Sequence, residues 1–184
     1  MRVISGIYKR RRFDVPHTFK ARPTTDFAKE NLFNVLCNNY IDFEENITAL
    51  DLFAGTGQMG IEALSRGARE CVFVDSSRQS LNIVKENLKL CSLQGTVISG
   101  DAVSYLSRGE KFDLVFMDPP YDSDLYEKCL EALHQFDILS DGGIIICESR
   151  QDRTIPGTFL NDYSMKQYRY GKIKITVLRK QEQE

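Results

Sequence analysis

From residue 46 onward, short runs of apolar residues alternate with helix-like stretches, and this alternation most limits how the chain can fold. The runs are nearly continuous, which is typical of strands buried on both faces of a parallel sheet. The sequence therefore predicts an α/β fold with helices covering both sides of the sheet. The expected strands are 47–52, 71–75, 96–98, 112–117 and 143–147. The expected helices are 59–66, one that begins after Ser76 or Ser77, 103–106 and 125–136.

The two ends of the chain depart from this alternation. Tyr163–Tyr170 and Lys172–Leu178 are strand-like runs separated only by Gly171, which leaves no room for a crossover helix. We expect them to form an antiparallel hairpin that completes the sheet. Residues 3–6 and 11–15 predict a small N-terminal β-hairpin, and a leading helix is expected over 24–40. The expected division is a basic hairpin or arm at 1–22, a main domain at 23–180 and a tail at 181–184.

The composition limits the class of protein. The 184 residues suffice for one well-buried domain, and 42% hydrophobic with 27% charged residues is ordinary for a globular protein. The longest apolar runs are far shorter than the roughly 20 residues that span a bilayer, and the N-terminus is unlike a secretory signal. The five cysteines are widely spaced and contain no CxxC pair. We therefore expect buried, reduced thiols in a cytoplasmic protein, without a metal site.

The net charge of −2 hides an uneven distribution. Residues 1–22 contain seven basic side chains and one acid, Asp14, so the rest of the chain is acidic. Because nucleic acids are bound by local basic patches, this segment is a candidate phosphate-binding arm, with a merely solvated arm as the alternative. The candidate contacts are Lys9, Arg10, Arg11, Arg12, Lys20 and Arg22.

A glycine-rich turn follows the first expected strand. Gly55, Gly57 and Gly60 have the G-x-G-x-x-G spacing between a buried strand and a helix, where backbone N–H groups can approach a ligand closely. Asp75 ends the next strand, where a carboxylate can accept hydrogen bonds from ribose hydroxyls. This context predicts a nucleoside-binding site.

A dinucleotide and S-adenosylmethionine both suit such a site. Asp51, before the glycines, would repel a pyrophosphate but could accept from the methionyl ammonium of S-adenosylmethionine, which favours the second ligand. Asp101 could accept from an adenine amino group while the Ala102 N–H donates to a ring nitrogen, although an acid there is as easily a helix cap. The predicted cofactor-binding residues are Asp51, Phe53, Ala54, Gly55, Gly57, Asp75, Ser76, Asp101 and Ala102.

The fourth expected strand ends in Asp118-Pro119-Pro120-Tyr121, a rigid turn at the sheet edge where open α/β sheets bind ligands. The exocyclic amine of a nucleobase is a poor nucleophile because its lone pair is delocalised into the ring. An ionised Asp118 and the Pro119 carbonyl could accept its N–H groups and stabilise the positive charge that develops during methyl transfer. Tyr121 could stack on the base. We therefore interpret these four residues as the catalytic residues of an amino-group methyltransferase.

The sequence resembles the RsmD family of 16S ribosomal RNA guanine-N2 methyltransferases, which belong to the class I, Rossmann-like methyltransferases. Arg22-Pro23-Thr24-Thr25-Asp26 and Glu62-Ala63-Leu64-Ser65-Arg66-Gly67-Ala68 are its most specific parts. The resemblance also includes 2–6, 32–34, 51–57, 60–61, 118–121 and 170–171, so it covers nearly the whole chain. One departure is Asp75, where many relatives carry Glu.

This resemblance implies a seven-stranded, mostly parallel sheet with a C-terminal antiparallel hairpin. It also implies S-adenosylmethionine as the cofactor and N2 of guanine 966, in the family's nomenclature, as the methylated position. The implied partner is 16S ribosomal RNA in an assembled or assembling small ribosomal subunit, and we expect a monomer. The block Lys9–Arg12 would then grip RNA phosphates without reading their sequence.

Three other functions remain open at this stage. An adenine-N6 DNA methyltransferase could use the same tetrapeptide, but the chain lacks an evident target-recognition domain. Protein glutamine methylation is less favoured, because that family typically has Asn at the position of Asp118. A non-catalytic ribosome-assembly or RNA-binding module is the alternative from a different class. The complete set of Asp51, Asp75, Asp101 and the tetrapeptide favours an active enzyme.

Overall fold

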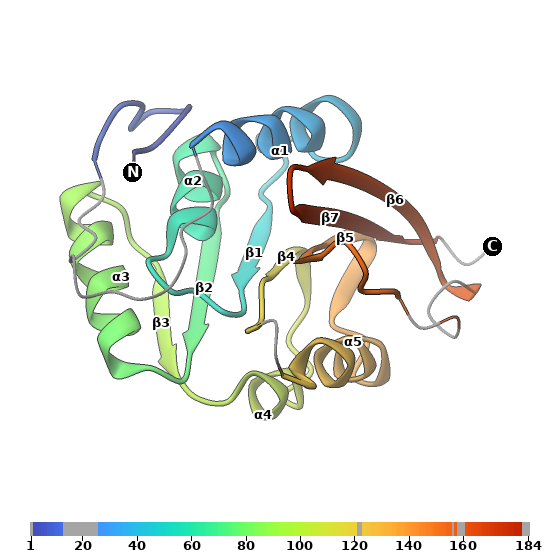
Figure 1. The fold of residues 1–184 in the computed structure, drawn as a ribbon. Coiled ribbons are helices and arrows are strands. Elements are labelled where there is room, and N and C mark those ends of the chain that lie inside the picture. The colour runs from blue at the N-terminus through green and yellow to red at the C-terminus, as the bar shows by residue number, and fades with distance from the viewer. Residues whose placement is uncertain (1, 13–25, 121–122, 156, 158–160, 182–184) are drawn as a thin grey trace.

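A seven-stranded sheet with helices on both faces forms the centre of the computed structural model (Figure 1). The structure describes residues 2–12, 26–120, 123–155, 157 and 161–181. The strands lie in the order β3-β2-β1-β4-β5-β7-β6. They are β1 Thr48–Asp51, β2 Glu70–Asp75, β3 Thr96–Ser99, β4 Phe112–Met117, β5 Leu139–Arg150, β6 Tyr163–Tyr170 and β7 Ile173–Lys180.

The first five strands are parallel, and the last two form the antiparallel hairpin that the sequence predicted. β7 pairs antiparallel with β5, so the hairpin extends the sheet. The predicted α/β class and the seven-stranded sheet are therefore confirmed. β5 is longer than the expected 143–147, because Leu139 already pairs with Phe112 before a register shift.

The helices cover the two faces of the sheet unequally. They are α1 Asp26–Asn39, α2 Gln58–Arg66, α3 Arg78–Leu90, α4 Ala102–Leu106 and α5 Leu125–Gln135. Apolar side chains of α1, α2 and α3 share one core cluster with one face of the strands. Those of α4 and α5 form a second cluster with the other face. Alternate strand residues thus point into opposite cores, as expected for a sheet buried on both sides.

Two sequence expectations need correction. Residues 3–6 and the described part of 11–15 form no strands: one antiparallel bridge joins Arg2 to Arg12. Cys37 is exposed on α1, whereas the other four cysteines are buried as expected. Among the described residues, no helix combines the length and the apolar character needed to cross a membrane.

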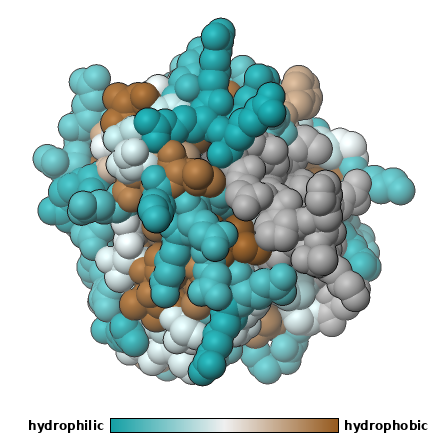
Figure 2. Space-filling model, turned by 90° about the vertical axis from the view of Figure 1, so that its left-hand side faces the viewer, coloured by the Kyte–Doolittle hydropathy of each residue, from teal (hydrophilic) through white to brown (hydrophobic). Residues whose placement is uncertain are grey.

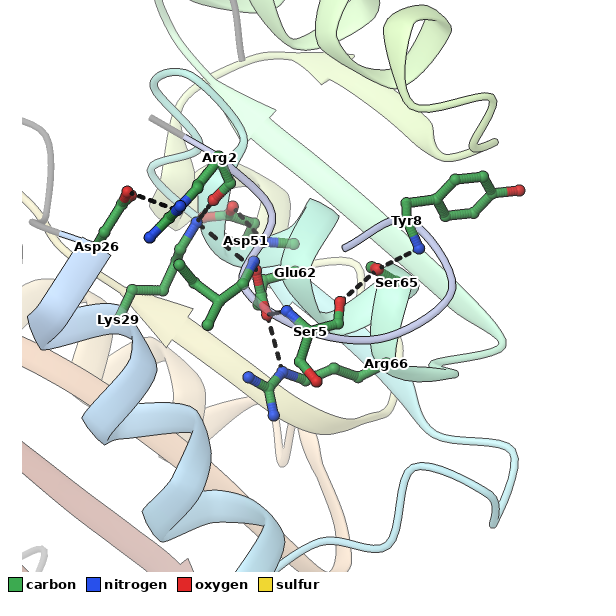
Figure 3. Close-up of polar contacts among 11 residues, drawn as sticks. Arg2, Ser5, Tyr8, Asp26, Lys29, Asp51, Glu62, Ser65 and Arg66 are labelled. Carbon is green, nitrogen blue, oxygen red and sulfur yellow. Dashed lines mark hydrogen bonds and ion pairs between the residues drawn. The ribbon is translucent and has the colours of Figure 1, made fainter. Parts of the chain in front are cut away.

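The N-terminal segment is held against α1 and α2 by a buried ionic cluster (Figure 3). Both carboxylate oxygens of Glu62 accept backbone hydrogen bonds, from the Ile4 N–H at 2.8 Å and the Ser5 N–H at 2.9 Å. The Lys29 ammonium lies 3.6 Å from the same carboxylate and donates to the Arg2 carbonyl at 2.7 Å. Arg66 donates to Glu62 at 2.9 Å. Residues 2–5 are therefore part of the packed domain rather than a free arm.

Gly6 is required where this segment passes over α2. Its backbone φ is +82°, and a Cβ there would lie 1.7 Å from the Ser65 carbonyl oxygen. The Ile7 N–H donates to that carbonyl at 2.9 Å, and the Ser65 hydroxyl donates to the Ser5 carbonyl at 2.7 Å. A side chain at position 6 would separate the segment from the helix.

Candidate functional site

A cavity of about 470 Å³ opens at the carboxyl ends of β1, β2, β4 and β5. This is the edge at which open α/β sheets bind ligands. The cavity is lined by Leu32, Asp51, Phe53, Ala54, Gly55, Thr56, Gln58, Met59, Asp75, Ser76, Ser80, Phe116, Met117, Asp118, Pro119, Pro120, Leu125, Ile146, Glu148, Ile173 and Ile175.

The glycine turn between β1 and α2 forms one wall of the cavity. Gly55 and Gly57 have φ values of +53° and +75°, a backbone region that favours glycine. The Asp75 carboxylate accepts from the Gly55 N–H at 2.9 Å and from the Ser77 N–H at 2.7 Å. Ser77 in turn caps α3 by accepting from the Ser80 N–H. Asp75 therefore joins the glycine turn to the start of α3, and its remaining lone pairs can accept from a ligand.

Gly60 brings α2 into direct contact with β2. A Cβ on this residue would lie 2.3 Å from the Phe73 ring and 2.6 Å from the Cys71 sulfur. The Gly60 N–H donates to the buried Asp51 carboxylate at 3.0 Å. The third glycine of the motif thus allows close helix–sheet packing and fixes Asp51 at the end of β1.

Four carboxyl groups share the cavity: Asp51, Asp75, Asp118 and Glu148. Burial raises the pKa of Asp51 to about 7, with a further contribution from the Asp75 charge and an opposing one from the Gly60 N–H. Loss of hydration against the cavity walls raises the pKa of Asp118 well above its ordinary value, and the charges of Glu148 and Asp51 raise it further. The ordinary carboxyl pKa assumed from the sequence therefore does not apply to Asp118.

The acidic side chains that line this cavity suit a cationic organic ligand. None of the described residues that line it is basic, so a bound cation would face four acids without a competing positive charge from these residues. Its proximity would favour the ionised forms of those acids. In the described part of the chain, no group of three or more His, Cys, Asp or Glu side chains has a metal-binding arrangement. An ammonium or sulfonium group suits the cavity better.

The proline turn lies at the opposite wall, directly after β4. Pro119 is buried, and Asp118 reaches the solvent through the cavity. Ser123 closes the turn, because its N–H and its hydroxyl both donate to the Pro120 carbonyl, at 3.2 and 2.7 Å. Tyr121 lies outside the described residues. The bonds from Ser123 therefore fix the Pro120 carbonyl next to the cavity edge at which Asp118 and Pro119 lie.

Most of the predicted cofactor residues come together in this cavity, namely Asp51, Phe53, Ala54, Gly55, Asp75 and Ser76. Gly57, Asp101 and Ala102 do not line it. Gly57 is buried against Val84, and Asp101 caps α4 by accepting from the Ser104 N–H at 2.8 Å. In the structure Asp101 is therefore the N-cap of α4, which is the alternative that the sequence left open.

Several lining residues were not predicted from the sequence. Glu148 could have been noticed, because it follows the apolar run of β5 as Asp51, Asp75 and Asp118 follow or end theirs. Leu32 of α1 and the hairpin residues Ile173 and Ile175 carry no such local signal. They reach the cavity only because the N-terminal helix and the hairpin fold back over the sheet.

The basic block Lys9–Arg12 lies far from this cavity. Arg11 donates to the Leu90 carbonyl at 2.6 Å and to the Ser92 hydroxyl at 3.0 Å, at the end of α3 opposite to Asp75. With 13 residues, α3 is about 20 Å long. Lys9, Arg10, Arg11 and Arg12 are all exposed. The N-terminal segment lies at the side of the molecule that faces the viewer in Figure 2, where hydrophilic side chains predominate and hydrophobic ones form separate patches. Lys20 and Arg22 lie outside the described residues.

Comparison with known proteins gives consistent matches along the chain. The family model described as "Conserved hypothetical protein 95" matches residues 1–179. The ribosomal RNA small subunit methyltransferase D of Haemophilus influenzae is 35% identical over 161 residues, which are 84% of this chain and 81% of that protein. The solved structure of Escherichia coli yhhF is 30% identical and superposes with a TM-score of 0.85, covering 100% of this chain and 99% of that one.

A more distant structure shares the fold and was solved with bound ligands. It is the Thermus thermophilus 16S rRNA N2 G1207 methyltransferase in complex with AdoMet and guanosine. The TM-score is 0.73 at 19% identity, over 89% of this chain and 45% of that protein. At this level of identity the likeness concerns the fold.

Proposed function

This chain belongs to the RsmD family, and we propose that it transfers the methyl group of S-adenosylmethionine to the exocyclic N2 amine of a guanine in 16S ribosomal RNA. The target is guanine 966 in the family's nomenclature. The observation that carries the proposal is the position of Asp118 and Pro119 at the edge of a cavity lined by acids. This arrangement supports an amine-binding role for the turn beside a site for a cationic methyl donor.

The cavity residues fit S-adenosylmethionine group by group. Asp51 and the glycine turn suit the methionyl part, which carries an ammonium and a carboxylate. Asp75 suits the ribose hydroxyls, because the Gly55 N–H fixes its carboxylate beside the glycine turn and its other lone pairs can accept hydrogen bonds. Phe53, Met59 and Leu125 provide apolar surface. When bound, the cofactor supplies an electrophilic methyl group on a positively charged sulfur.

Asp118 prepares the amine for attack. Its carboxylate accepts one amine N–H and the Pro119 carbonyl accepts the other, which directs the nitrogen lone pair toward the methyl group. Positive charge develops on the nitrogen during transfer, and the ionised Asp118 stabilises it. The raised pKa of Asp118 also suits it to receive the departing proton afterwards. Tyr121 remains the predicted stacking partner of the base.

The distance between the basic block and the cavity favours a large RNA substrate. A ligand that contacts both Lys9–Arg12 and Asp118 must reach along α3, over about 20 Å. A free nucleoside is too small to do so, whereas folded RNA in a small subunit can. This supports the assembled or assembling small ribosomal subunit as the substrate and the basic block as a distant phosphate contact.

The test is methyl transfer from labelled S-adenosylmethionine to small subunits that lack the modification. We expect one methyl group per subunit, mapped to N2 of a single guanine by mass spectrometry of the digested RNA. Parallel reactions with duplex DNA and with free guanosine should remain unlabelled. Labelled N6-methyladenine in DNA would instead identify the alternative enzyme, and RNA binding without cofactor affinity would identify a non-catalytic module.

A further inference from the structure

Asp118 and Glu148 lie side by side at the carboxyl edge of the sheet. β4 and β5 are parallel, and their register pairs Met117 with Cys147. Asp118 and Glu148 are the next residues along these two chains, and neighbouring strands lie about 4.8 Å apart. The Glu148 charge accordingly contributes to the raised pKa of Asp118. A group that contacts Asp118 is therefore within reach of a second acid.

A second cavity, of about 350 Å³, adjoins the first one at this point. Pro119, Pro120 and Glu148 line both cavities, so these residues form the border between them. Its volume lies in the usual range for small-molecule pockets, roughly 300–1,000 Å³. A base in the second cavity could present its edge to Asp118 and Glu148 while the methyl donor occupies the first.

The wall of the second cavity is held in place by Arg153. Its guanidinium lies over the Tyr126 ring, 5.4 Å from the ring centroid, which is within the limit of about 6 Å for a cation–π contact. It also pairs with Glu127 at 3.1 Å and donates to the Ser123 carbonyl at 2.9 Å. Ser123 closes the proline turn, so Arg153 connects this wall to the residues that hold Asp118.

The bases differ in the atom that adjoins their exocyclic amine. In guanine the neighbour of the 2-amine is N1, which carries a hydrogen and donates. In adenine and cytosine the neighbour of the amine is a ring nitrogen with a lone pair, which accepts. A carboxylate beside the amine therefore accepts a hydrogen bond from guanine and repels the other two amino bases. Flipped bases are commonly read in this way along their Watson–Crick edge.

We propose that Glu148 selects guanine, by accepting the N1–H of the base while Asp118 and Pro119 accept the N–H groups of its 2-amine. The base occupies the second cavity with its amine at the border. This inference rests on the proposed guanine-N2 activity and adds the residue that sets base specificity. Sites built to pair with a hydrogen-bond donor reject analogues that lack it by large factors, on the order of 10⁴.

The test uses 2-aminopurine, which keeps the 2-amine but has a lone pair at N1. Small subunits are reconstituted with RNA that carries guanine or 2-aminopurine at the target position, and kcat/KM is measured for each. We expect wild-type protein to prefer guanine by at least about 100-fold. In Glu148→Gln the amide can donate to N1 of 2-aminopurine, so the preference should fall below about tenfold.

The ratio of the two substrates separates base recognition from other effects of the variant. Glu148→Gln also removes a charge next to Asp118, but that change acts on both substrates and cancels in the ratio. Glu131→Gln, on the exposed side of α5, is the matched control and should keep the wild-type preference. An unchanged preference in Glu148→Gln would overturn the inference while leaving the proposed function intact. If wild-type protein methylated neither base, the proposed function itself would fail.

Discussion

Asp51 at the end of β1 and Glu62 in the middle of α2 are both buried carboxylates, yet they have opposite surroundings. Glu62 is paired with Lys29 and Arg66 and accepts from two backbone N–H groups. Asp51 accepts from the Gly60 N–H and faces other acids across the cavity. A carboxylate buried against cations stabilises the fold around it, whereas a group of acids that face one another across a cavity is suited to a positively charged ligand. Changes at Glu62 should therefore affect stability, whereas changes at the cavity acids should affect activity and cofactor affinity.

Glu62→Gln should give the largest effect, and it should appear in stability. The substitution leaves the Lys29 ammonium buried without its counter-ion, in a site where desolvation already lowers the pKa of Lys29. We expect the free energy of unfolding to fall by about 3–5 kcal/mol, measured by urea denaturation. Glu86→Gln, on the exposed side of α3, should change it by less than about 0.5 kcal/mol. Equal stabilities of the two variants would contradict the structural role of the ionic cluster.

Asp118→Ala should produce the converse result, with a large loss of activity and an unchanged or increased stability. Removal of one acceptor of the amine should lower kcat by about 10²–10³-fold, as for other groups that stabilise developing charge. Stability should not fall, because the variant removes a carboxyl group from a cluster of like charges. Methyl transfer to small subunits and urea denaturation measure the two quantities. A marked loss of stability would place Asp118 with Glu62 rather than in the site.

Cofactor affinity should depend on pH through Asp51. The folded pKa of about 7 is raised above the ordinary 3.8, so ionisation of this group costs stability between these values, and the full cost is present above pH 7. A cationic ligand binds the ionised form, so binding below pH 7 must release a proton. We expect affinity for S-adenosylmethionine to fall up to about tenfold per pH unit below 7.

Calorimetry between pH 5.5 and 8 measures this dependence. In Asp51→Asn the affinity at pH 8 should be lower and its pH dependence weaker, while stability above pH 7 should rise relative to wild type. Asp118 titrates in the same cavity, so some pH dependence should remain in this variant. An affinity that is independent of pH in wild-type protein would exclude Asp51 as a cation-binding group.

The sequence predicted the site best where the number of residues between two parts of a motif determines that they meet in the fold. The link between Asp75 and the glycine turn was predictable, because a strand and helix of ordinary length bring them together. Glu148 was not singled out because β5 continues past it to Arg150, although, like Asp118, it follows an apolar run. Ile175 reaches the cavity through its antiparallel pairing with Glu148. That register depends on a hairpin whose position no local pattern reveals.

Charge alone also did not reveal the location of the basic block. Seven basic residues near the N-terminus predict an attraction for phosphates, but not the distance from the reaction. That distance depends on the packing of residues 2–8 against α1 and α2, through Glu62 and Ser65. Glu62, Ser65 and Gly6 are ordinary residues in a sequence, and only their contacts show that they position the segment.

The smallest predicted effect separates the arginines of the basic block. All three arginines are exposed, but Arg11 also donates to the Leu90 carbonyl and the Ser92 hydroxyl and lies over the Tyr8 ring. We expect Arg10→Gln with Arg12→Gln to lower the slope of log affinity against log salt by about 1–2, since each lost phosphate contact removes roughly one. Arg11→Gln should change the slope by less than the double variant and should lower stability slightly instead. Filter binding to small-subunit RNA at several salt concentrations measures the slopes. If all three arginines contributed equally, the segment would contact RNA in an arrangement other than the one that holds Arg11 against α3.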